Sequence, residues 1–351
     1  MEDVYKRLAR HLDNTPGGYP ETESGVELRI LKQLFTPEEA ELDLSLIMMP
    51  EPAASIAARA GKDVDQIEPI LKEMGKKGLI VHINKKGADT YMLAQFVVGI
   101  WEYQVNRLTR QLIEDFNEYV PHLMKSIEKQ KTQQLRVIPV EKSIHTELNV
   151  MNHERVENLI RTQSKILVAP CICRREHTMV DKGCGKIEEA CLIFGGGAYL
   201  YESRGIGRTI SQDEALEIVR TGVKQGLVPQ PSNTVNPINI CLCCDCCCQI
   251  LSNIKKTEAP AKIVNSNFQA QVDPDQCTAC GACSDICPMD ALEIEDAAAV
   301  HPDRCIGCGL CVTVCDFDAV ALRERKDTER WDPPQTIVDT YMKIAKEKGL
   351  F

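Results

Sequence analysis

The sequence has few aromatic residues, no long apolar run and no cysteine among its first 170 positions. Aromatic side chains make up 5% of the 351 residues, too few for an extended platform on which nucleic-acid bases would stack. The longest strongly apolar stretch, around Phe96 to Trp101, is far shorter than the roughly 20 residues that cross a bilayer. The first residues also lack the basic and apolar regions of a signal peptide. We therefore expect a cytoplasmic protein without a membrane span.

The composition is otherwise that of an ordinary globular chain. Hydrophobic residues make up 44% and charged residues 26%, which leaves ample apolar material for a core. The net charge of −10 argues against a general binder of polyanions. The length predicts two or three domains.

Cysteine is the abundant exception. All 18 cysteines lie between Cys171 and Cys315. Disulfides do not persist in a reducing cytoplasm, so we expect these thiols to serve metal binding or redox chemistry. Their absence from the N-terminal part also predicts a domain boundary ahead of them.

Residues 1–97 have the pattern of a small helical unit that ends in a hairpin. Thr36-Pro-Glu-Glu39 is typical of a capped helix start, and residues 53–60 and 64–74 have helical patterns, the second interrupted by Pro69. Alternating residues over 78–93 predict two strands around a turn. This order of elements resembles a winged helix-turn-helix domain. The resemblance covers about 70 residues and is one of architecture, without a diagnostic motif.

The charge of this part disfavours DNA as its partner. Residues 1–100 hold 12 Lys and Arg against 16 Asp and Glu, a balance of 12 − 16 = −4, whereas DNA affinity depends largely on neutralising phosphates. The basic residues near the expected wing are Lys76, Lys77, Lys85 and Lys86. We therefore favour protein docking over DNA binding for this part.

Two four-cysteine runs near the C-terminal end repeat one spacing. The first consists of Cys277, Cys280, Cys283 and Cys287, followed by Pro288. The second, 28 residues later, consists of Cys305, Cys308, Cys311 and Cys315, followed by Asp316. The spacing C-x₂-C-x₂-C-x₃-C resembles the bacterial two-cluster ferredoxins, in which the fourth cysteine of each run binds the other cluster. The resemblance covers about residues 265–325.

The resemblance implies two [4Fe–4S] clusters with crossed ligand sets. Cluster 1 would be held by Cys277, Cys280, Cys283 and Cys315. Cluster 2 would be held by Cys305, Cys308, Cys311 and Cys287. Because all four thiolate positions of each cluster are filled, the clusters would move electrons rather than bind substrate. Structural zinc is the alternative for four cysteines, and the close match of spacing favours iron–sulfur.

Ten further cysteines precede these runs, six of them within residues 241–248. They are Cys171, Cys173, Cys184, Cys191, Cys241, Cys243, Cys244, Cys246, Cys247 and Cys248. In an extended segment, successive side chains alternate between faces, which predicts that one face carries Cys241, Cys243 and Cys247. The other would carry Cys244, Cys246 and Cys248. Ten ligands allow one or two further centres, including a three-ligand cluster with an open iron. We expect iron–sulfur rather than zinc here.

These parts together predict a multidomain α+β protein. The expected division is a winged-helix-like domain over 1–97, a long connecting helix over 98–135, a cysteine-rich α/β domain over 136–260, a two-cluster ferredoxin domain over 265–325 and a C-terminal helix over 326–351. The apolar spacing from Trp101 to Leu123 is consistent with packing on the N-terminal domain and equally with a homodimer through residues 98–123.

The predicted function is electron transfer. We expect single electrons to pass through the two clusters, with the chain acting as a carrier or subunit of an anaerobic oxidoreductase system and exchanging electrons with a redox partner protein. Two alternatives remain open at this point: an iron–sulfur-dependent, redox-sensing winged-helix transcription regulator, and a reductase with an open-site cluster in the middle domain. No catalytic residue, flavin site or nicotinamide site is apparent in the sequence.

Overall fold

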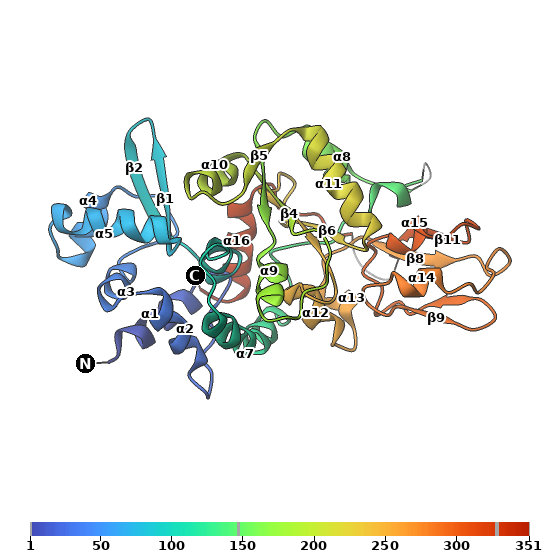
Figure 1. The fold of residues 1–351 in the computed structure, drawn as a ribbon, viewed down its shortest axis with the longest axis horizontal. Coiled ribbons are helices and arrows are strands. Elements are labelled where there is room, and N and C mark those ends of the chain that lie inside the picture. Colours follow the sequence, from blue (N-terminus) through green and yellow to red (C-terminus); the bar gives the residue numbers. More distant parts are fainter. Residues whose placement is uncertain (1, 146–147, 327–329, 351) are drawn as a thin grey trace. The chain divides into compact units, whose positions relative to one another are not determined.

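The computed structural model describes residues 2–145, 148–326 and 330–350 (Figure 1). The chain forms two compact units. The first comprises the residues up to Lys129, the segment Tyr199–Ile206 and the residues from Ala345 onward, and the second comprises Gln130–Ala198 and Gly207–Ile344. All 18 cysteines fall in the second unit. Among the described residues, no helix has the length and apolarity needed to cross a bilayer.

The first unit is mainly helical. Its helices are α1 Val4–Asp13, α2 Val26–Leu34, α3 Pro37–Asp43, α4 Ala53–Ala60, α5 Val64–Lys77, the irregular turn η1 Phe96–Ile100, α6 Trp101–Tyr103 and α7 Arg110–Ile127. Its strands are β1 Ile80–Lys85 and β2 Ala88–Leu93, an antiparallel pair in which Ile80 faces Leu93. Two more helices, α10 Gly195–Ser203 and α16 Ile337–Glu347, begin in the second unit and end in the first.

Local signals account for most of the elements in this unit. Thr36 and Glu39 form the expected capping box, because the Thr36 side chain accepts a hydrogen bond from the Glu39 amide at 3.2 Å and the Glu39 carboxylate accepts one from the Thr36 amide at 2.9 Å. α5 continues through Pro69 and ends at Gly78, whose positive φ of 75° suits a helix C-terminus.

The long helix predicted from residue 98 is wrong at its start. α7 begins at Arg110, where the Thr109 hydroxyl accepts a hydrogen bond from the Leu112 amide at 3.2 Å. Trp101 instead lies in the three-residue α6, and its ring stacks on that of Phe116 with centroids 3.6 Å apart. The chain therefore folds back to bury Trp101. The apolar side of α7 packs against α2 within the unit.

The second unit contains a five-stranded antiparallel sheet in the order β5-β3-β4-β7-β6. Its strands are β3 Ile166–Pro170, β4 Glu189–Phe194, β5 Arg208–Ile210, β6 Val228–Pro231 and β7 Asn239–Cys243. The helices around it are η2 Glu141–Ser143, η3 Asn152–Glu154, α8 Val156–Arg161, α9 Ile172–Met179, α11 Gln212–Lys224, α12 Gln249–Lys255 and α13 Pro260–Ile263.

The two faces of this sheet differ in character. Val168, Leu192 and Ile240 belong to the apolar core that includes buried residues of α11. Residues one position away in a strand point to the opposite face, and these include Cys191 and Cys241, which are direct cross-strand partners on β4 and β7. The sheet therefore carries apolar core on one side and cysteines on the other.

The C-terminal module, residues 265–325, belongs to the same compact unit as the sheet. It contains β8 Phe268–Val272, α14 Ala282–Asp285, β9 Leu292–Ile294, β10 Ala298–Val300, α15 Leu310–Thr313 and β11 Val320–Glu324. Figure 1 shows the labelled elements of the module, β8, α14, β9, α15 and β11, gathered together. β8 and β11 pair antiparallel, with Phe268 facing Glu324, so the first and last strands of the module are neighbours.

Candidate metal centres

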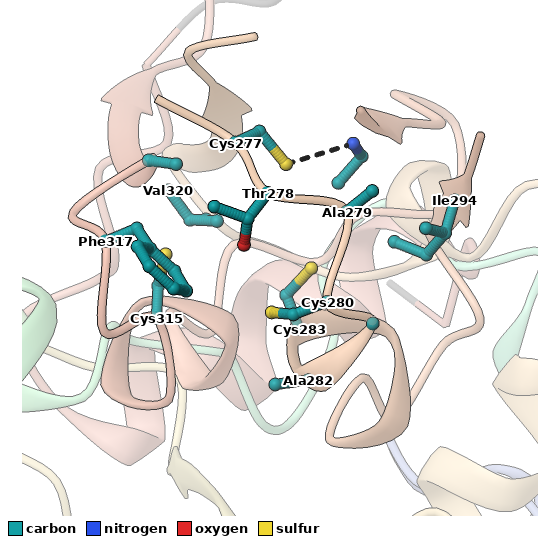
Figure 2. A pocket seen from close by; sticks show the side chains of 13 residues that line it. Cys277, Thr278, Ala279, Cys280, Ala282, Cys283, Ile294, Cys315, Phe317 and Val320 are labelled. Atoms are coloured by element: carbon teal, nitrogen blue, oxygen red, sulfur yellow. Dashed lines mark hydrogen bonds between the residues drawn. The ribbon is translucent and has the colours of Figure 1, made fainter. Parts of the chain in front are cut away.

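Two pockets in the C-terminal module are lined by cysteine. The first collects Cys277, Cys280, Cys283 and Cys315. Figure 2 shows these side chains around one space, with Phe317 beside Cys315. The second collects Cys287, Cys305, Cys308 and Cys311. Each pocket thus brings together three cysteines of one run and the fourth cysteine of the other, the two sets that the resemblance to two-cluster ferredoxins implies.

The backbone around both pockets is arranged to stabilise sulfur that carries negative charge. The amides of Ala298, Ala291 and Ala270 each donate a hydrogen bond at 3.3 Å to a cysteine sulfur, those of Cys277, Cys287 and Cys305 respectively. Such hydrogen bonds tune cluster potentials in iron–sulfur proteins. The cysteine-lined pockets and their amide donors fit two clusters held by thiolates.

The two pockets differ in exposure. Cys305, Cys308 and Cys311 are buried, whereas Cys280 in the first pocket is exposed. Burial raises the pKa of the Cys308 and Cys311 thiols, so these sites favour the neutral thiol until a cation binds. The first pocket therefore contains the more exposed cysteines of the two.

Six of the ten remaining cysteines form one connected group of sulfurs, the six-sulfur group. Its members are Cys171, Cys173, Cys191, Cys241, Cys243 and Cys248. The side chains of Cys171 and Cys248 raise the pKa of Cys173, which places them beside it. Those of Cys241 and Cys248 raise the pKa of Cys243, and those of Cys191 and Cys243 lower the pKa of Cys241. Four elements contribute to the group: β4, β7, the start of α9 and the start of α12.

One cysteine of this group, Cys248, is held toward the thiolate form. Cys171 is the N-cap residue of α9, and Cys248 is that of α12. Hydrogen bonds from Cys173 and Cys243, together with those from the backbone of Leu251 and Ile250, lower the pKa of Cys248 against the effect of burial. A thiolate is the form that binds metal, so the group is suited to holding a centre.

The other four cysteines form a compact tetrad, Cys184, Cys244, Cys246 and Cys247. Their Sγ atoms all lie within 4.8 Å of one another. Cys184 comes from the loop between α9 and β4, and the other three come from the turn between β7 and α12. Cys244 and Cys247 are buried, Cys184 is half-buried and Cys246 is exposed.

This grouping corrects the predicted division of the 241–248 run. The chain is extended only as far as Cys243 and then turns through residues 245–247. Strict alternation therefore ends, which places Cys247 in the tetrad and Cys248 in the six-sulfur group. Spacing alone could not show this, because the partner Cys184 lies about 60 residues away in the sequence.

A buried arginine lies beside the middle cysteines. Arg174 is 3% exposed, and its guanidinium donates hydrogen bonds at 3.1 Å to the Leu242 carbonyl and at 3.8 Å to the Cys244 sulfur. Burial lowers the pKa of Arg174, but the neighbouring Cys171 and Cys244 raise it by more, so the net shift of the pKa is upward. A permanent positive charge here offsets the negative charge that several thiolates would bring.

Comparison with known proteins finds a match for part of the C-terminal module and for no other part of the chain. Residues 276–319 match the family described as a 4Fe-4S dicluster domain. No curated protein and no solved structure matches the chain. Residues 276–319 therefore form a ferredoxin-like iron–sulfur module within a larger mixed α/β chain.

Proposed function

We propose that this protein transfers single electrons through two [4Fe–4S] clusters in its C-terminal module, as a carrier or subunit of an anaerobic oxidoreductase system. The observation that carries the proposal is the crossed grouping of eight cysteines into two four-sulfur pockets. Four thiolates per cluster leave no iron open to a substrate, and the clusters supply one-electron chemistry.

Exposure suggests the order of transfer. The first pocket opens at the surface beside Phe317, which is 49% exposed, so a redox partner would exchange electrons there. The second pocket is buried and contacts the middle of the chain, since the Cys308 carbonyl accepts a hydrogen bond from the Val140 amide at 2.9 Å. Electrons would therefore pass between the partner, cluster 1, cluster 2 and the middle domain.

The six-sulfur group would hold a further iron–sulfur centre at the inner end of this path. It offers more thiols than the four that one cluster requires, and it lies in the same compact unit as the module. Its cysteines form a continuous series of neighbours, from Cys191 through Cys241, Cys243, Cys248 and Cys173 to Cys171.

We assign the N-terminal domain to partner docking rather than to DNA. Lys77 pairs with Glu39 at 2.7 Å, and Lys72 pairs with Glu68 at 2.9 Å, so basic side chains of α5 are already neutralised by carboxylates. Phosphate binding requires free positive charge. The ion pairs therefore weigh against the transcription-regulator alternative.

The proposal is tested with Cys315→Ser in the full chain, purified without oxygen. The variant should lose about four irons and four acid-labile sulfides, because Cys315 completes the first pocket. Thr278→Ala, which lines the same pocket without offering a thiol, should keep them. Dithionite-reduced samples should show one fewer cluster signal by electron paramagnetic resonance. Unchanged iron and sulfide in Cys315→Ser would contradict the proposal.

A further inference from the structure

The tetrad is compact on the scale of a single metal ion. Its four sulfurs lie within 4.8 Å of one another. One tetrahedral ion with metal–sulfur bonds of about 2.3 Å places its ligand sulfurs roughly 3.8 Å apart. The observed spread leaves room for an ion at the centre and little room for anything larger.

The module provides an internal comparison. In a four-iron cluster each thiolate binds a different iron, so the ligand sulfurs stand around a core several ångströms across. Among the residues that the structure describes, the tetrad is the one group of three or more metal-ligating side chains gathered within that limit. The cysteines that line the two pockets of the module are therefore spaced more widely than the tetrad is.

We propose that Cys184, Cys244, Cys246 and Cys247 bind one tetrahedral metal ion, zinc or iron, without inorganic sulfide. This deepens the proposed function in one respect, by dividing the middle cysteines into a single-ion site and a separate cluster site. For these four cysteines it replaces the sequence expectation of iron–sulfur rather than zinc. Four thiolates occupy all four coordination positions of a tetrahedral ion, so the site would be structural rather than catalytic.

The position of the tetrad shows what the ion would do. It joins the loop between α9 and β4 to the turn between β7 and α12, two segments far apart in the sequence. Both segments also carry residues of the six-sulfur group, Cys191 shortly after the loop and Cys248 directly after the turn. Fixing the loop to the turn would hold those cysteines in place for the neighbouring centre.

The surroundings suit a doubly charged cation held by four thiolates. Such a site has a net charge of about −2, and the Arg174 guanidinium next to Cys244 offsets part of it. The Cys247 amide also donates a hydrogen bond to the Cys244 sulfur at 3.4 Å. Cys246 is exposed, which gives an ion access to the site from solvent.

The test compares Cys246→Ala with Asp245→Ala in the full chain purified without oxygen. Cys246 is exposed, so its replacement removes a ligand with little change in packing. Asp245 occupies the same turn and offers no sulfur. The cysteine variant should lose about one zinc or one iron per chain and no acid-labile sulfide. The aspartate variant should keep its full content of metal and of acid-labile sulfide. If three cysteines retain the ion, the double variant Cys184→Ala/Cys246→Ala should release it.

Loss of about four irons with four sulfides would overturn the proposal in favour of a cluster. Loss of neither metal nor sulfide, even in the double variant, would overturn it in favour of free thiols. Spectroscopy of the unaltered chain provides a second test, which needs no variant. Zinc-edge X-ray absorption should show four sulfur neighbours at about 2.3 Å, or Mössbauer spectra should show a mononuclear high-spin iron separate from the clusters. Neither result depends on Cys315, so the two proposals fail independently.

Discussion

Two glycines at equivalent places in the repeated cysteine runs meet different surroundings. Gly281 and Gly309 each follow the second cysteine of their run and have φ of +83° and +76°. A Cβ on Gly309 would lie 2.2 Å from the Ser143 Oγ and 2.6 Å from its Cβ, whereas one on Gly281 would meet nothing within 4 Å. The second run is therefore packed tightly against the 141–143 turn, and the first is not.

Gly309→Ala should destabilise the protein more than Gly281→Ala. Both variants carry the same backbone strain, but only the first adds a clash, with an extra cost of about 1–3 kcal/mol. Thermal unfolding of the loaded protein should show the lower Tm for Gly309→Ala, together with faster loss of iron. Equal Tm values would show that Ser143 moves aside without cost.

Arg174 and Arg175 are adjacent arginines with different roles. Arg175 pairs with Glu188 at 2.6 Å near the surface, whereas Arg174 is buried beside Cys244. We expect Arg174→Met to reduce metal retention in the middle domain and to cost about 3–5 kcal/mol, because it leaves buried thiolate charge uncompensated. Arg175→Met should change stability by less than about 1 kcal/mol. Metal content and Tm, measured side by side, check this pair.

At the scale of elements, α3 carries a buried carboxyl. Asp43 is fully buried, and neither carboxyl oxygen has a hydrogen-bond partner among the described residues. Burial raises its pKa well above the ordinary value. As pH rises past about 3.9 the unfolded chain releases this proton while the folded chain keeps it, so stability falls with rising pH until the folded group also ionises.

Asp43→Asn should remove that pH-dependent penalty. The free energy of unfolding of the variant, relative to that of the unaltered protein, should increase between pH 5 and pH 7 by up to about 1.4 kcal/mol for each pH unit. Thermal unfolding should show this as a growing difference in Tm. Glu38→Gln, an exposed change on the same helix, should show little such trend. A constant difference across this pH range would mean that the Asp43 carboxyl is already ionised in the folded protein.

Local pattern predicted the elements whose signals are local. The capping box of α3 and the hairpin of β1 and β2 both follow from neighbouring residues. The predicted helix from residue 98 was wrong because the position of Trp101 is decided by its stacking on Phe116 rather than by helical spacing. A periodic apolar pattern cannot distinguish these two ways of burying the same side chain.

The same limit applies to the candidate sites. The eight cysteines of the module were predictable because their spacing repeats within short runs. In the 241–248 run, the predicted grouping holds as far as Cys246 and fails at Cys247 and Cys248, because the chain turns through residues 245–247. Asp245 is the sole residue typical of a turn there, so the sequence signals this turn only weakly. Cys184 meets this turn because of the way the sheet folds. The spacing of cysteines along the sequence carries no information about that contact.

At the scale of the whole molecule, the candidate metal ligands are confined to one of the two units. The second unit contains every cysteine, and the first contains none. Removing the metals without oxygen, by acid and a chelator, should therefore loosen one unit and spare the other. Hydrogen exchange should speed up in β7 and in the module while α1, α2 and α7 keep their protection. Equal loss of protection in both units would show that they unfold together.

The pairing of β8 with β11 has a consequence for biogenesis. The chain enters and leaves the module at one edge, and each pocket borrows a cysteine from the opposite half. A ribosome that has made only the first run has therefore produced three of the four sulfurs of one pocket and a single sulfur of the other. Neither pocket has all four of its sulfurs until the second run has emerged, so a polypeptide truncated before Cys305 would retain neither of the two proposed clusters.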